Sequence, residues 1–145
     1  MSGPTMVTMA RIKRIFDDMK LVYDVDADGD LRLGWDNAQL YVIVEESRAR
    51  MNAGWRGRPS NPEDLAKITE MVVDCNSNRV GPKAAILEGE EGSIVTAECA
   101  VYSTTGLSDE QLENWVNVSV EMCMGFLMEV EEVMPHLVTW DEEED

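Results

Sequence analysis

The chain has 145 residues, 44% of them apolar, which is enough material for one hydrophobic core and one domain. Its net charge of −17 is uneven, because all twelve Lys and Arg lie between Arg11 and Lys83 and residues 84–145 contribute acidic charge only. A surface of that sign repels phosphate and argues against nucleic-acid binding, and no apolar run is long enough to cross a bilayer.

The first part of the chain predicts one helix followed by an antiparallel meander. Met9, Ile12, Phe16 and Met19 recur at helical spacing, which predicts an amphipathic helix over residues 5–20. Short β-favouring runs follow and predict strands, with the third run central because it is apolar on both faces. These runs are residues 21–25, 31–35, 39–46 and 49–57.

The middle of the chain predicts a second helix and a hairpin. Asn61 is a good N-cap and Pro62 suits the first helical position, so the helix is expected to begin there. It is expected to end at residues 76–82, whose Asn, Gly and Pro do not continue a helix. Residues 83–89 and 93–102 then predict two strands joined by a tight turn.

The last helix is the segment that a simple core explains least well. Ser108 and Gln111 have capping-box spacing, which predicts a helix from Asp109 to about Met134, where Pro135 ends it. Apolar residues occupy its flanks as well as its core stripe, and a belt this wide indicates a partner surface, although full burial inside the domain is the alternative. The predicted partner-binding residues are Trp115, Val118, Met122, Met124, Phe126 and Met128.

An aspartate-rich stretch, DVDADGDLRLGWD, begins at Asp24 and partly matches a calcium-binding loop. The twelfth position is Trp35, where such a loop needs a bidentate acid, and the flanks predict strands. Asp28 and Gly29 form a dipeptide that two-residue hairpin turns prefer, with positive φ at both residues. We therefore expect a turn, and keep as the alternative a weak calcium or small-ligand site. Its ligands would be Asp24, Asp26, Asp28 and Asp30.

Nothing in the sequence predicts an enzyme, a cofactor or a structural metal centre. Cys75, Cys99 and Cys123 include no CxxC pair and fall in apolar segments, so we expect buried, inert thiols. His136 lies about 20 Å along the helix direction from Cys123, which excludes a Cys–His pair. No glycine-rich phosphate loop or activated nucleophile is present.

With this order of elements, the chain resembles the YbjN family, small bacterial proteins described as sensory transduction regulators. The resemblance is carried by DADGDLRLGW, QLYVIVEE, DCNSNRVGPKAAI, GSIVTAE and TGLSDEQLENWVNVSVEMCMGFLMEVEEVMP. It is weaker in the middle, where Gly57, Arg58 and Pro59 separate the fourth strand from the second helix. The resemblance implies a fold similar to type III secretion chaperones, which are acidic and usually dimerise, and it brings no catalytic residues.

We therefore predict an α+β domain in which five or six antiparallel strands pack against three helices. The domain is expected to span residues 1–138, with a mobile acidic tail over residues 139–145. Its predicted function is non-catalytic, chaperone-like or regulatory protein binding in the cytoplasm, with an unidentified protein partner and no membrane contact. Homodimerisation is expected through the last helix or an exposed strand. The basic strip from Arg48 to Arg58 is a second candidate surface, for the acidic half of another copy.

Overall fold

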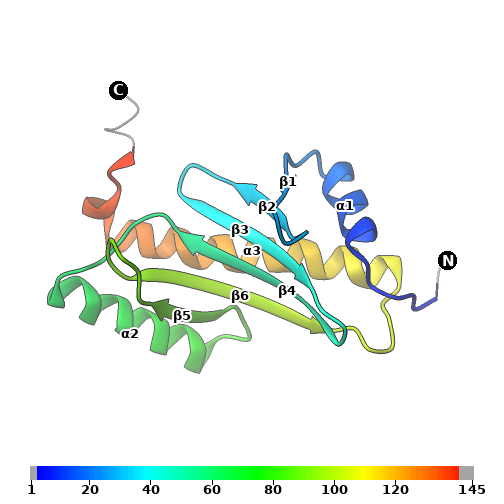
Figure 1. Ribbon diagram of the computed structural model, residues 1–145. Helices are drawn as coiled ribbons and strands as arrows, with labels where there is room; N and C mark the ends of the chain where they lie inside the picture. The colour runs from blue at the N-terminus through cyan, green and yellow to red at the C-terminus, as the bar shows by residue number, and fades with distance from the viewer. Residues whose placement is uncertain (1–2, 141–145) are drawn as a thin grey trace.

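The computed structural model describes residues 3–140 and contains a six-stranded sheet and three long helices (Figure 1). The helices are α1 (Met9–Asp18), α2 (Pro62–Asn78) and α3 (Asp109–Val133), followed by a 3₁₀ turn, η1 (Pro135–Leu137). The strands are β1 (Asp24–Val25), β2 (Leu31–Gly34), β3 (Ala38–Val44), β4 (Arg48–Trp55), β5 (Lys83–Leu87) and β6 (Ile94–Tyr102). The predicted fold class and element order are confirmed.

The strands pair in the order β1-β2-β3-β4-β6-β5, and every pairing is antiparallel. Helix α3 runs behind the sheet in Figure 1 and packs mainly on β6 and β4. Helix α2 lies along β5 at one edge, and α1 contacts α3 at the other end. The side of the sheet opposite α3 carries no helix in Figure 1, and we call it the open face.

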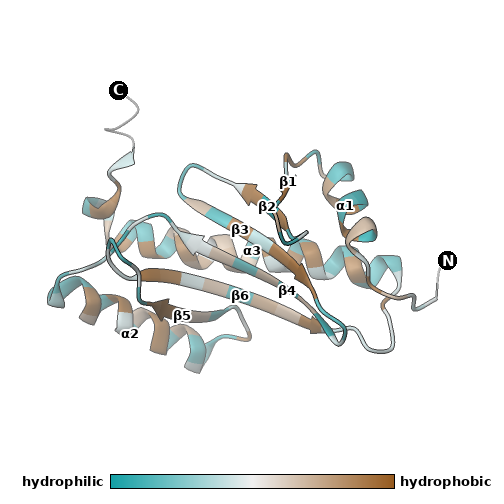
Figure 2. Cartoon of the chain, in the orientation of Figure 1, coloured by the Kyte–Doolittle hydropathy of each residue, from teal (hydrophilic) through white to brown (hydrophobic). Residues whose placement is uncertain are grey.

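Strand alternation places the core between the sheet and α3. Along β4, Ala49, Met51, Ala53 and Trp55 are buried while the residues between them are half-buried. Figure 2 shows the same contrast as brown and teal bands along the strands and helices. Because successive side chains point to opposite faces, one sequence pattern produces a packed face and an open face.

Local signals in the sequence explain where the helices begin. Asn61 accepts a hydrogen bond from the Asp64 N–H and caps α2, as predicted. Ser108 and Gln111 form the predicted capping box at the start of α3. The predicted start of α1 at residue 5 is wrong, because Thr8 is the N-cap. Thr5 instead forms a backbone bridge with Leu107, beside the last helix.

The Asp28–Gly29 turn differs from the predicted two-residue hairpin. Only Gly29 has positive φ, at 88°, and the Asp26 N–H bonds the Asp30 carbonyl at 2.9 Å across a three-residue loop. The Gly29 N–H also bonds the Asp26 carbonyl, so a turn followed by a left-handed glycine closes the hairpin. The strand before it is shorter than predicted and contains only two residues.

The C-terminal segment packs more tightly than its predicted mobility suggests. Trp140 is 4% exposed and its ring meets that of Trp55 edge-on, with centroids 6.4 Å apart. The Arg56 guanidinium lies 5.2 Å from the centre of the Trp140 ring. The rest of the predicted tail, residues 141–145, lies outside the described residues. His136 Nε2 lies 3.0 Å from a carboxylate oxygen of Asp64 and thus connects this segment to α2.

Helix α2 also covers the outer edge of the sheet. The Asn76 side-chain oxygen accepts a hydrogen bond from the Ala84 N–H at 2.8 Å, and its amide group donates to the Ala84 carbonyl at 2.9 Å. One side chain therefore satisfies both outward-facing backbone groups of Ala84 in β5, as a neighbouring strand would.

Candidate functional site

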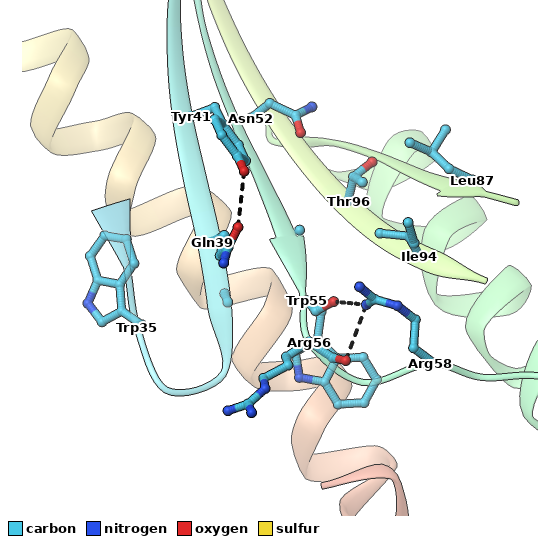
Figure 3. A pocket seen from close by; sticks show the side chains of 12 residues that line it. Trp35, Gln39, Tyr41, Asn52, Trp55, Arg56, Arg58, Leu87, Ile94 and Thr96 are labelled. Atoms are coloured by element: carbon cyan, nitrogen blue, oxygen red, sulfur yellow. Dashed lines mark hydrogen bonds between the residues drawn. The ribbon is translucent and has the colours of Figure 1, made fainter. Parts of the chain in front are cut away.

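A groove of about 550 Å³ lies on the open face, across β3, β4 and β6 (Figure 3). Cross-strand register creates it, because Gly34, Gln39, Gly54, Thr96 and Ala85 form one row across the sheet. Four of these five residues are small, so the row forms a depression between larger neighbours. A Cβ on Gly54 would meet only Ile94, at 3.8 Å, so the space above this glycine is open.

Aromatic and aliphatic side chains form the walls of the groove. Figure 3 shows Trp35 and Tyr41 on one side and Leu87 and Ile94 on the other. Leu87, the last residue of β5, is 51% exposed and lies opposite Ile94 in the pairing of β5 with β6. Tyr41 is oriented by a hydrogen bond from its hydroxyl to Gln39 Oε1 at 3.0 Å.

Arg58 closes one end of the groove. Its guanidinium donates to the Trp55 carbonyl at 2.7 Å and to the Arg56 carbonyl at 3.2 Å, which folds the chain after β4 back over the strand end. This path of the chain requires glycine at position 57, because a Cβ on Gly57 would overlap the indole ring of Trp55. The Gly57–Pro59 break in the sequence therefore builds the end of the groove.

The strand positions of the open face and the groove lining, together with their ion-pair partners, contain six cationic and three acidic residues, and each of the three acids pairs with an arginine. The cationic residues of this set are Arg32, Arg48, Arg50, Arg56, Arg58 and Lys83, and the acidic ones are Asp24, Glu45 and Glu98. Further acidic side chains lie beside this set, with Asp30 near Arg50 and Glu91 beside Arg56 and Arg58.

Ion pairs hold these side chains in fixed positions along the face. The Arg32 guanidinium donates two hydrogen bonds to the Asp24 carboxylate, of 3.0 and 2.7 Å. This contact lowers the pKa of Asp24 below its ordinary value. Arg50 bridges Glu45 at 2.6 Å and Glu98 at 2.8 Å, and its hydrogen bond likewise lowers the pKa of Glu45. The face therefore combines paired charges with a groove that both apolar and polar side chains line.

The six predicted partner-binding residues of α3 do not share one environment. Phe126 is 2% exposed and is part of the core, so its assignment to a partner surface is wrong. Met128 is 55% exposed, and the other four, Trp115, Val118, Met122 and Met124, are half-buried. The indole N–H of Trp115 is buried without an acceptor among the described residues.

The aspartate loop brings together three of its four predicted ligands. Carboxylate oxygens of Asp26, Asp28 and Asp30 lie within 4.8 Å of one another, whereas Asp24 is outside this group and pairs with Arg32. Asp26 Oδ1 accepts the backbone N–H groups of Asp28 and Asp30, which is what a turn requires. Burial, with the charges of Asp26 and Asp28, raises the pKa of Asp30.

Reasoning from the sequence missed the groove and the pairing of two cysteines. Glycines at Gly34 and Gly54, in strands that are otherwise well filled, were the available signal for the groove. The Sγ atoms of Cys99 in β6 and Cys123 in α3 lie 3.9 Å apart, and Cys99 is only half-buried. Their separation of 24 residues gave no hint of this contact.

The sequence profile of the YbjN family, described as "Putative bacterial sensory transduction regulator", matches residues 8–132. The chain belongs to the YbjN family. The match covers most of α1 to α3, so the whole sheet and both surfaces described above lie within the family domain. The description of the family names a regulator, and YbjN is not a known enzyme family.

A solved structure agrees in fold. The crystal structure of YbjN from E. coli, described as "a putative transcription regulator", matches with a TM-score of 0.73 over 92% of this chain and 96% of that one. The two sequences are 14% identical, so this likeness concerns the fold alone. No curated protein matches the chain. Within residues 3–140, no helix has both the length and the apolar content that crossing a bilayer requires.

Proposed function

We propose that this YbjN protein is a non-catalytic regulatory domain that holds an acidic, extended segment of a partner protein in the groove of its open face. The observation that carries the proposal is an uncovered groove with apolar walls and two arginines in its lining, Arg56 and Arg58. Apolar walls supply the affinity, and the surrounding arginines select the sign of the partner's charge.

The dimensions of the groove suit a few side chains of an extended chain. Its volume of about 550 Å³ falls within the usual range for ligand pockets. Side chains of an extended peptide alternate in direction, so every second residue would enter the groove between Tyr41 and Ile94. The residues between would carry carboxylates toward Arg58 and the other cations of the open face.

The test measures binding of a fluorescein-labelled ten-residue peptide in which glutamate alternates with leucine, against a peptide with lysine in place of glutamate. We expect the glutamate peptide to bind and the lysine peptide to bind at least about tenfold more weakly. Gly54→Phe fills the groove from an open position and is expected to weaken binding by at least about tenfold. Tyr41→Ala, which removes one wall, provides a second variant.

Two matched controls lie on α3. Gly125→Ala adds a methyl group where nothing lies within 4 Å, and Met128→Asp places a charge on the exposed side of the same helix. Both are expected to bind the glutamate peptide as the unchanged protein does. If Met128→Asp abolishes binding while Gly54→Phe retains it, the binding surface is α3 and the proposal is overturned.

A second copy of the chain is the competing occupant of the groove, since residues 84–145 supply acidic charge. Light scattering of the unchanged protein and of Gly54→Phe separates the two occupants. A dimer that dissociates in Gly54→Phe would assign the groove to self-association and contradict the acidic partner. A mass that is the same in both proteins, together with peptide binding lost in Gly54→Phe, supports the partner.

A further inference from the structure

The three cysteines of the chain converge where α2, β6 and α3 meet. The Cys123 thiol points at Cys99 Sγ across 3.9 Å and at the Met51 carbonyl oxygen across 4.0 Å. Cys75 donates to the Pro82 carbonyl at 3.4 Å, and burial raises its pKa, with a smaller contribution from negative charge on Cys99. The two closest thiols therefore belong to a strand and to the helix that covers it.

The two thiols of this pair have different environments. Cys123 is fully buried, whereas Cys99 is half-buried and is thus the more accessible residue of the two. Hydrogen bonds from Cys123 and Ser119 lower the pKa of Cys99 to about 7, although burial opposes them. The contact with Cys99 and burial raise the pKa of Cys123. Ser119 is buried in the core stripe of α3, and its hydroxyl forms a hydrogen bond that helps to lower the pKa of Cys99.

We propose that Cys99 and Cys123 form an oxidisable dithiol, in which a peroxide converts the pair to an intramolecular disulfide that links β6 to α3. This site is independent of the groove, since it lies on the covered side of the sheet.

The chemistry balances with hydrogen peroxide as the oxidant. The Cys99 thiolate attacks one peroxide oxygen, the O–O bond breaks, and Cys99 becomes a sulfenic acid while the other oxygen leaves as water after taking up a proton. The Cys123 sulfur then attacks the Cys99 sulfur, the S–O bond breaks, and the hydroxyl leaves as water with the Cys123 proton. Two thiols lose two electrons, and one peroxide becomes two waters.

Closure of the disulfide needs a movement of the two thiols. The sulfur atoms must approach from 3.9 Å to about 2.05 Å for the bond to form. Cys75 is the internal reference, because it is fully buried and hydrogen-bonded to Pro82. Because Cys75 is in the same protein, comparing its modification with that of Cys99 and Cys123 shows which thiols are oxidised.

The test uses the reduced, full-length protein with hydrogen peroxide, followed by alkylation of the remaining thiols under denaturing conditions and peptide mass spectrometry. We expect one peptide pair joined through Cys99 and Cys123, lighter by two hydrogen atoms, with Cys75 alkylated. Cys75→Ser is expected to give the same crosslink. In Cys123→Ser, dimedone is expected to trap a sulfenic acid on Cys99.

The crosslink is measured in the unchanged protein, so the result does not depend on whether a variant folds. Reduction with dithiothreitol is expected to restore all three thiols. Oxidation of Cys99 to a sulfinic acid without a crosslink would overturn the proposal, as would a disulfide that includes Cys75 or that joins two chains.

Discussion

On the covered face of the sheet, Leu40 and Met51 are fully buried beneath α3, while their neighbours Gln39 and Asn52 line a groove on the open face. These residues alternate along the same two strands, so a change of one position moves a side chain from the core to solvent. Apolar burial contributes about 25 cal/mol per Å², and nearly all of it lies on the covered side. The hydrophobic core and the groove proposed for binding thus lie on opposite sides of one layer of backbone.

The largest expected effect tests the covered face. Phe126→Ala removes a buried ring from α3 and leaves a cavity, so we expect the free energy of unfolding to fall by about 3–5 kcal/mol. Urea denaturation measures it, with Asn52→Ala on the open face as the control, expected within about 0.5 kcal/mol. A stable Phe126→Ala variant that fails to bind the acidic peptide would instead place Phe126 at an interface.

The next effect tests whether the end of the described chain belongs to the covered core. Trp140→Ala removes the ring that packs on Trp55 and is expected to cost about 3 kcal/mol, since Trp140 is 4% exposed. Tyr102→Ala is the matched control, because Tyr102 is 84% exposed and its loss is expected to cost about 0.5 kcal/mol or less. Equal losses in the two variants would contradict the packing of Trp140 described above.

A smaller effect concerns the charges of the open face. The folded pKa of Asp24 lies below its unfolded value, so its contact with Arg32 stabilises the fold above the unfolded pKa. This contribution is lost as the pH falls through the folded pKa. In Arg32→Gln, NMR titration is expected to show the pKa of Asp24 returning upward toward its ordinary value. An unchanged titration would mean that the pair does not form in solution.

The smallest expected effect is at the aspartate loop. Calorimetric titration with calcium is expected to show no binding tighter than about millimolar, because Trp35 occupies the position of the bidentate acid. Asp26 is also occupied by two backbone N–H groups of its own turn. A micromolar response that disappears in Asp26→Ala would favour the alternative function of a calcium-responsive sensor.

The sequence predicts the features that local chemistry controls. Asn61 with Pro62, and Ser108 with Gln111, mark the starts of two helices because the capping groups are within three residues of their partners. The alternation of Val95 and Ala97 with Thr96 likewise predicts strand β6. Each of these signals is read without knowing what lies across the fold.

The remaining features depend on contacts between distant segments. The groove exists because register places Gly34 and Gly54 in one row, and no pattern within a single strand contains that register. The burial of Phe126 rather than Met128 depends on how α3 is rotated on the sheet, which a uniformly apolar belt leaves undetermined. The contact between Cys99 and Cys123 depends on both the register of the strands and the rotation of α3 on the sheet.

The Asn76 side chain affects whether another chain can pair with the edge of the sheet. With Ala84 already satisfied by an amide, β5 offers an incoming chain no free backbone groups at this point, and the opposite border of the sheet, β1, contains only two residues. Neither border provides a long template for edge-to-edge strand addition, the route by which exposed sheets polymerise into fibrils. A partner of the kind proposed above would therefore contact the broad surface of the sheet and not extend the sheet by a further strand.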